Sequence, residues 1–137
     1  MYNLFISHSW SYENNYIGLC NLLDDASYFT HKNYSVSKDD PIRILAKNDY
    51  WYENKLRIKL REQMKYASIV PILAGVYASY SDSIDMEISI AKELVKPIIA
   101  IEPWGAERTS AVVKNNAKVV VAWNTNSIVK DIREYSL

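Results

Sequence analysis

The sequence is short of glycine, cysteine and histidine, and each shortage excludes a class of chemistry. Three glycines in 137 residues form neither a Gly-x-Gly-x-x-Gly dinucleotide fingerprint nor a phosphate-cradling Walker loop. Cys20 is the single cysteine, so the chain has no intramolecular disulfide. His8 and His31 are the only histidines and no cysteine cluster accompanies them, so we expect no metal site.

The chain also lacks a charge excess and a long apolar run. Sixteen basic and sixteen acidic side chains cancel, whereas nucleic-acid binding is typically accompanied by a basic surplus. No apolar run approaches the roughly 20 residues of a membrane span, and the first residues lack the basic segment of a signal peptide. We therefore expect a cytoplasmic protein that binds neither nucleic acid nor membrane, folded as a single domain over residues 1–137.

Short apolar runs alternate with helical patterns along the whole chain. Strands are predicted at 4–6, 34–36, 69–74, 98–101 and 119–123, and helices at 12–26, 53–66, 81–95, 107–115 and 127–135. Such alternation is typical of a parallel sheet covered on both faces. Right-handed crossovers then favour an α/β fold with a flavodoxin-like, doubly wound, five-stranded parallel sheet. Between the second strand and the second helix, residues 37–52 are predicted as a long polar loop with room for a helical turn.

One carboxylate interrupts the apolar face of the helix predicted at 81–95. Glu87 falls between Ala91 and Leu94 at roughly 100° per residue, inside the apolar stripe. A carboxylate in that position must be paired, protonated or functional, because an unpaired buried charge is expensive. Two interpretations follow: a catalytic carboxylate, or a structural ion pair with a lysine or arginine of the helix at 53–66. The full apolar stripe comprises Ile84, Ile88, Ala91, Leu94 and Val95.

Polar and aromatic residues gather where the carboxyl ends of the predicted strands meet, which is where ligands bind in such sheets. Hydroxyl groups, aromatic faces and a carboxylate together suit a ligand built of sugars and bases. Metal ligands are not among the candidates. The candidates for base stacking are Phe5, Trp10 and Tyr80, and those for polar contacts are Ser7, His8, Ser9, Lys38, Ser83 and Asn124.

The segment Phe5-Ile6-Ser7-His8-Ser9, the strand–helix alternation and a glutamate on the third helix resemble a Toll/interleukin-1 receptor (TIR) domain. More narrowly, the chain resembles the short TIR-like proteins of bacterial Thoeris antiphage systems. The resemblance implies an enzyme that consumes NAD+ as its substrate, without a further cofactor, and Glu87 occupies the position of the catalytic glutamate. It also implies self-association for activity and a cyclic ADP-ribose-type product that activates a separate effector.

The chain departs from the resemblance at one point. TIR enzymes often carry a tryptophan a few residues before the glutamate, and this sequence has Ser81-Asp82-Ser83-Ile84 there. A single carboxylate nevertheless suits the reaction, because nicotinamide leaves as a neutral base and the oxocarbenium-like ribose needs negative charge nearby. The alternative is a TIR-like interaction module without catalysis, which assembles with itself or with another chain.

Overall fold

The computed structural model describes residues 1–7, 13–37, 40–47, 49–75, 82–103 and 110–137. Within these ranges the chain alternates strands and helices much as the sequence predicts, and the strand predicted at 98–101 is found with the same bounds. In chain order the elements are β1 (Tyr2–Leu4), α1 (Glu13–Asp25), β2 (His31–Asn33), α2 (Pro41–Ala46), α3 (Tyr50–Met64), β3 (Val70–Leu73), α4 (Asp82–Glu93), β4 (Ile98–Ile101), α5 (Ala111–Asn116), β5 (Val119–Val121) and α6 (Thr125–Tyr135).

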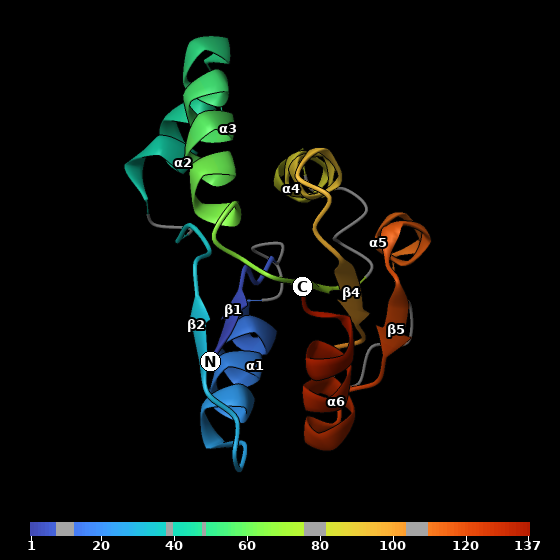
Figure 1. Cartoon of the computed structure of the whole chain (residues 1–137). Coiled ribbons are helices and arrows are strands. Elements are labelled where there is room, and N and C mark those ends of the chain that lie inside the picture. Colours follow the sequence, from blue (N-terminus) through green and yellow to red (C-terminus); the bar gives the residue numbers. More distant parts are fainter. Residues whose placement is uncertain (8–12, 38–39, 48, 76–81, 104–109) are drawn as a thin grey trace.

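Among the described residues, the strands form two parallel sheets, so the prediction of one continuous five-stranded sheet is wrong. β1 pairs with β2, and β3, β4 and β5 form the second sheet in that order. Two isolated bridges, Leu4 to Ile69 and Ser7 to Ile72, place β1 beside β3. The strands therefore lie in the order β2-β1-β3-β4-β5, which is the flavodoxin-like order (Figure 1).

Pro71 explains why the ladder between β1 and β3 is interrupted. Successive backbone N–H groups of a strand point to opposite neighbours. In β3, the N–H of Leu73 donates to the carbonyl oxygen of Ser7 at 3.1 Å, whereas Ala74, just after the strand, donates to Ile101 of β4 at 2.8 Å. Pro71 lies two residues before Leu73, so its backbone nitrogen points toward β1 as that of Leu73 does. Proline has no N–H, so it donates no hydrogen bond there. The carbonyl of Pro71 still accepts from the N–H of Ser7 at 2.8 Å, which keeps the two strands adjacent.

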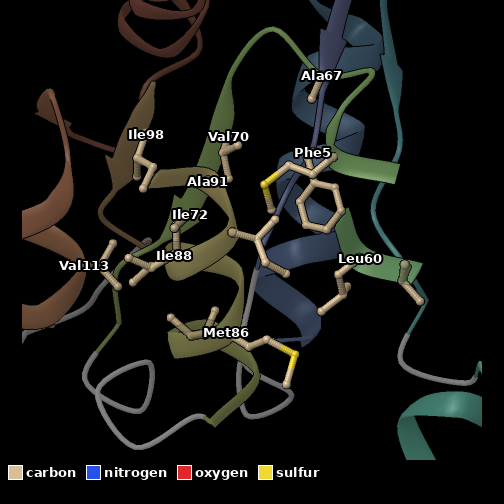
Figure 2. Close-up of a cluster of buried hydrophobic side chains, with 14 of the residues drawn as sticks. Phe5, Leu60, Ala67, Val70, Ile72, Met86, Ile88, Ala91, Ile98 and Val113 are labelled. Atoms are coloured by element: carbon tan, nitrogen blue, oxygen red, sulfur yellow. The ribbon is translucent and has the colours of Figure 1, made fainter. Parts of the chain in front are cut away.

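Helices cover both faces of the strands. In Figure 1, α3, α4 and α5 lie above the strands, and α1 and α6 lie below them. Side chains alternate between the two apolar clusters with the period of two that strands impose: Phe5 joins the cluster under α3 and α4, while Leu4 and Ile6 join the cluster under α1 and α6. Figure 2 shows the first cluster, in which Phe5, Leu60 and Ile72 come together with side chains of α4.

Two elements lie outside the predicted bounds near the second strand. β2 is found three residues before its predicted position, at His31–Asn33, and the segment predicted as a loop contains α2 and the first residues of α3. α2 begins in the way a capped helix does. Asp40 accepts a hydrogen bond from the N–H of Ile42 at 3.1 Å, and Pro41 occupies the first helical position. Asp40 also pairs with Lys59 of α3 at 2.5 Å, which joins the two helices.

α4 ends earlier than predicted. Its last residue is Glu93, and Val95, predicted on the apolar stripe, is 78% exposed. Val95 has a φ of 54°, in the left-handed region, while the N–H of Lys96 donates to Ala91 at 2.8 Å and that of Val95 donates to Lys92 at 3.1 Å. This pair of bonds is the Schellman ending of a helix, in which glycine usually occupies the left-handed position.

No helix in the described part of the chain is long and apolar enough to cross a membrane.

Candidate active site

Ser7 lies just beyond the carboxyl end of β1, in an isolated bridge to Ile72 of β3. Its N–H donates to Pro71 and its carbonyl oxygen accepts from Leu73, so two backbone bonds to β3 fix its position. The side chain lies on the same face as Phe5, two residues earlier, and is 1% exposed. Its hydroxyl donates a hydrogen bond to Oε2 of Glu87. The strand end therefore presents one fixed donor to the carboxylate of α4.

Glu87 lies in the apolar face of α4, as the sequence predicts. The residue is 2% exposed, and its neighbours Met86 and Ile88 are buried in the cluster under α3 and α4 (Figure 2). Asp85, one position before Met86, faces solvent. The carboxylate is therefore removed from water and depends on protein groups for its hydrogen bonds.

Arg43 supplies the second partner of this carboxylate. Its Nη2 donates to Oε1 of Glu87 at 2.9 Å, and its Nη1 donates to the hydroxyl of Ser83 at 2.7 Å. Nε and Nη2 also donate to the carbonyl oxygen of Val36, at 3.0 and 2.9 Å. The Arg43 side chain is 7% exposed. One side chain of α2 thus joins the segment after β2 to two residues of α4.

The electrostatics of Glu87 reflect opposing effects. Burial raises the pKa of Glu87 above its ordinary value, because the charged form loses its hydration. The positive charge of Arg43 and the hydrogen bonds from Ser7 and Arg43 lower the pKa of Glu87, and desolvation outweighs them. Removing either partner would therefore shift the carboxyl group further toward its protonated form.

The structure brings together part of the residues predicted for the site. Ser7, Ser83 and Glu87 belong to one hydrogen-bonded network through Arg43. Phe5 lies beside them in sequence but has 0% exposure in the apolar core, so its ring is packed against protein and offers no open stacking surface. The remaining predicted residues His8, Ser9, Trp10, Lys38 and Tyr80 lie outside the described residues.

Asn124 is not brought to this network. Its side chain caps α6 by accepting the N–H of Ser127 at 3.0 Å. It follows β5, which lies three strand positions from β1, or roughly 14 Å at the usual spacing between strands. Asn124 is therefore a structural cap in this arrangement.

Arg43 is the member of the network that the sequence interpretation missed. The ion pair with Glu87 exists, but its cation comes from α2 and not from the helix predicted at 53–66. The signal was present in Asp40-Pro41, since an aspartate followed by proline is a helix start as well as a turn. A helix beginning there places Arg43 in its first turn.

In the described part of the chain, no group of three His, Cys, Asp or Glu side chains could hold a metal ion.

Comparison with protein families places the sequence in a known family. The family described as "Thoeris protein ThsB, TIR-like domain" matches residues 5–108. The chain belongs to this family. The matched range contains Ser7, Arg43 and Glu87, so the whole hydrogen-bonded network lies within the TIR-like region. The protein is thus a Thoeris-type TIR-like defence protein.

Solved structures support the fold of this TIR-like domain. A 2-deoxyribosyltransferase from the psychrotolerant bacterium Bacillus psychrosaccharolyticus superposes with a TM-score of 0.60 at 15% sequence identity. The match covers 92% of this chain and 89% of the transferase. At this identity the likeness is one of fold. No curated protein matches the sequence.

Proposed function

We propose that this TIR-like domain consumes NAD+, cleaving the bond between nicotinamide and ribose, with Glu87 as the catalytic carboxylate. The observation that carries the proposal is the placement of Glu87. It lies in a largely apolar setting near the carboxyl end of β1, with one oxygen bonded to Ser7 and the other to Arg43. Ligands of doubly wound sheets bind beyond such strand ends, and a preorganised charge there stabilises a developing cation.

The proposed chemistry needs only this carboxylate. The C1′–N bond of NAD+ breaks, its electron pair moves to the nicotinamide nitrogen, and the ribose acquires oxocarbenium character. Nicotinamide leaves neutral from a cationic ring, so no general acid is required. Glu87 stabilises the cation and accepts hydrogen bonds from the ribose hydroxyls, because each carboxylate oxygen can accept a second bond. Exclusion of water then favours attack on C1′ by the adenine or by a ribose hydroxyl of the same molecule, which gives a cyclic ADP-ribose-type product. The proton that the attacking group loses passes to the carboxylate of Glu87.

The proposal includes partners beyond the substrate. Glu87 is 2% exposed, so NAD+ reaches it only after the groups that cover it move. We propose that self-association of the domain promotes this opening, and that the cyclic product acts as a signal for a separate effector. NAD+ is the substrate in this scheme, and no further cofactor takes part.

The test is the reaction itself. Concentrated wild-type protein and a Glu87→Gln variant are incubated with NAD+, and the products are separated by mass spectrometry. We expect nicotinamide release by the wild type and its loss in the variant, with a product mass that separates linear ADP-ribose from its cyclised form. Asp85→Asn is the matched control, because it makes the same chemical change on the solvent side of α4. No release by wild type, with a crowding agent and infected-cell lysate added, rejects the proposal.

A second function is favoured by one observation. The pair of Arg43 and Glu87 is buried and hydrogen-bonded at both ends, which is also how a structural ion pair looks. The alternative is a TIR-like interaction module that assembles without catalysis. It predicts that wild type and Glu87→Gln assemble alike and that neither releases nicotinamide.

A further inference from the structure

The guanidinium of Arg43 is bonded through all three of its nitrogens. It donates to the carbonyl oxygen of Val36, to the hydroxyl of Ser83 and to the carboxylate of Glu87. These acceptors come from the segment after β2 and from two positions on α4 one turn apart. Arg43 itself belongs to α2, which Asp40 and Lys59 tie to α3. The guanidinium thus fixes the carboxylate relative to three parts of the fold.

We propose that Arg43 is a positioning residue of the NAD+-cleaving site, one that orients the carboxylate of Glu87 and favours its charged form. This inference rests on the function proposed above. Arg43 is not proposed as a catalytic residue, because its donors are directed at protein groups. It acts through Glu87, by holding Oε1 while Ser7 holds Oε2.

The geometry requires arginine and not merely a positive charge. A guanidinium is a planar fork whose five N–H donors point in fixed directions, so it can hold several acceptors at once. The ammonium of lysine is a single point on a flexible stem. Lysine at position 43 would therefore restore the charge beside Glu87 but not the fixed geometry that also includes Val36 and Ser83. Charge and orientation can thus be separated by experiment.

The charges around the site are few among the described residues. Arg43 is the cation bonded to Glu87, and its charge also contributes to lowering the pKa of Asp40 at the start of α2. Lys59 of α3 holds the pKa of Asp40 below its ordinary value, so Asp40 stays ionised in the range where Glu87 titrates. Ser7 from β1 and Ser83 from α4 are uncharged donors and acceptors. Because the charge of Arg43 is the smallest of the effects on the pKa of Asp40, a change in the acid side of the pH profile upon substitution of Arg43 reports mainly on Glu87.

The first test measures nicotinamide release against pH for wild type, Arg43→Lys and Arg43→Met. We expect Arg43→Met to lower kcat by roughly 10- to 100-fold with little change in KM, because a misplaced catalytic group loses rate more than substrate binding. We also expect the acid limb of its profile to move to higher pH. Arg43→Lys should return the acid limb toward wild type while kcat stays low. Wild-type kcat and an unmoved limb in Arg43→Met overturn the proposal.

A second measurement separates positioning from folding and does not need activity. Thermal midpoints are compared for wild type, Arg43→Met, Glu87→Gln and the double variant. Arg43→Met should lower the midpoint much more in wild type than in the Glu87→Gln background, because only the former leaves a buried charge without its partner. Equal shifts in both backgrounds overturn the inference. Should wild type fail to cleave NAD+, the proposed function fails while this cycle still decides whether Arg43 holds Glu87.

The matched control is an arginine that pairs with a glutamate at the surface. Arg61 of α3 contacts Glu93 of α4 at 2.6 Å, and both are about half exposed. Arg61→Met should leave the pH profile and kcat unchanged and should shift the midpoint only slightly, since exposed pairs contribute little. An effect of Arg61→Met as large as that of Arg43→Met would contradict the proposal by showing that any arginine near α4 matters equally.

Discussion

Ser7 and Glu87 are 80 residues apart in the sequence and joined by a hydrogen bond from the hydroxyl of Ser7 to Oε2 of Glu87. Both are almost completely buried, so neither side chain has water as an alternative partner. The backbone of Ser7 is fixed by two bonds to β3, and Glu87 is fixed by the packing of α4. This bond therefore couples the end of the first strand to the helix that carries the candidate catalytic group.

Ser7→Ala should destabilise the fold and weaken the proposed reaction. It leaves a buried charged acceptor with one donor fewer, so the free energy of unfolding should fall by about 1–3 kcal/mol. Urea denaturation measures this change, and nicotinamide release measures the effect on the reaction. Ser27→Ala, at an exposed position, should change the free energy of unfolding by less than about 0.5 kcal/mol. Equal effects of the two substitutions would show that the bond contributes nothing.

The stability of the protein should depend on pH through Glu87. Burial raises the pKa of Glu87, so above the ordinary glutamate pKa of about 4.3 the folded protein holds a proton that the unfolded chain has lost. The free energy of unfolding contributed by this group therefore falls as pH rises from that value through the raised pKa. Glu87→Gln removes the titration.

The difference in unfolding free energy between wild type and Glu87→Gln measures this dependence, because all other titrating groups largely cancel. We expect wild type to lose stability relative to the variant as the pH rises from about 4 toward neutrality. Chemical denaturation of both proteins at several pH values gives the curve. A difference that grows in favour of wild type with rising pH would mean that Arg43 and Ser7 outweigh desolvation.

Val95→Gly should stabilise the protein. Val95 adopts a left-handed backbone with φ of 54° at the end of α4, and its side chain is 78% exposed, so little packing is lost. A non-glycine residue in this region costs roughly 1–2 kcal/mol, part of which is offset by the flexibility of glycine in the unfolded chain. We expect a net gain of about 0.5–1 kcal/mol in urea denaturation. Val95→Ala keeps the β-carbon and should not show the gain; the same gain in both variants would refute strain as the cause.

Asp40 should stabilise α2 as a cap more than as a charge. Asp40→Ala removes the acceptor for the N–H of Ile42 and should lower the free energy of unfolding by about 1 kcal/mol. Asp40→Asn keeps a capping oxygen and removes only the pair with Lys59, which is partly exposed, so its effect should be below about 0.5 kcal/mol. Urea denaturation distinguishes the two, and an equal loss in both variants would assign the effect to the ion pair.

Much of the fold was predictable because hydrophobic periodicity is strong where strands are buried on both faces. Ile98–Ile101 has four buried residues in a row and was found with its predicted bounds. β2 was misplaced because its residues, His31 to Asn33, are polar and are partly buried or exposed at the edge of the fold, whereas the apolar Tyr34 and Val36 follow it. The interruption between β1 and β3 arises because the nitrogen of Pro71, which has no N–H, faces β1. Which neighbouring strand this nitrogen faces can be stated only once the strand order is known, and the sequence alone does not give that order.

The candidate site was predictable only in part for a similar reason. Glu87 stood out because helical periodicity places it among apolar residues within its own helix. Its partner did not, because α2 has six residues and is too short to have a periodic pattern. Arg43 becomes part of the site only through the packing of α2 against α3, from which its side chain reaches Ser83 and Glu87 of α4. Local patterns identify a group that needs a partner, while tertiary structure decides which residue provides it.

The most direct test of the central claim is the rate of nicotinamide release from NAD+ by Glu87→Gln compared with Asp85→Asn, at equal amounts of folded protein. If Glu87 is the catalytic carboxylate, Glu87→Gln should lose at least about 100-fold in rate while Asp85→Asn stays near wild type. Equal rates in wild type and both variants would contradict the assignment of catalysis to Glu87.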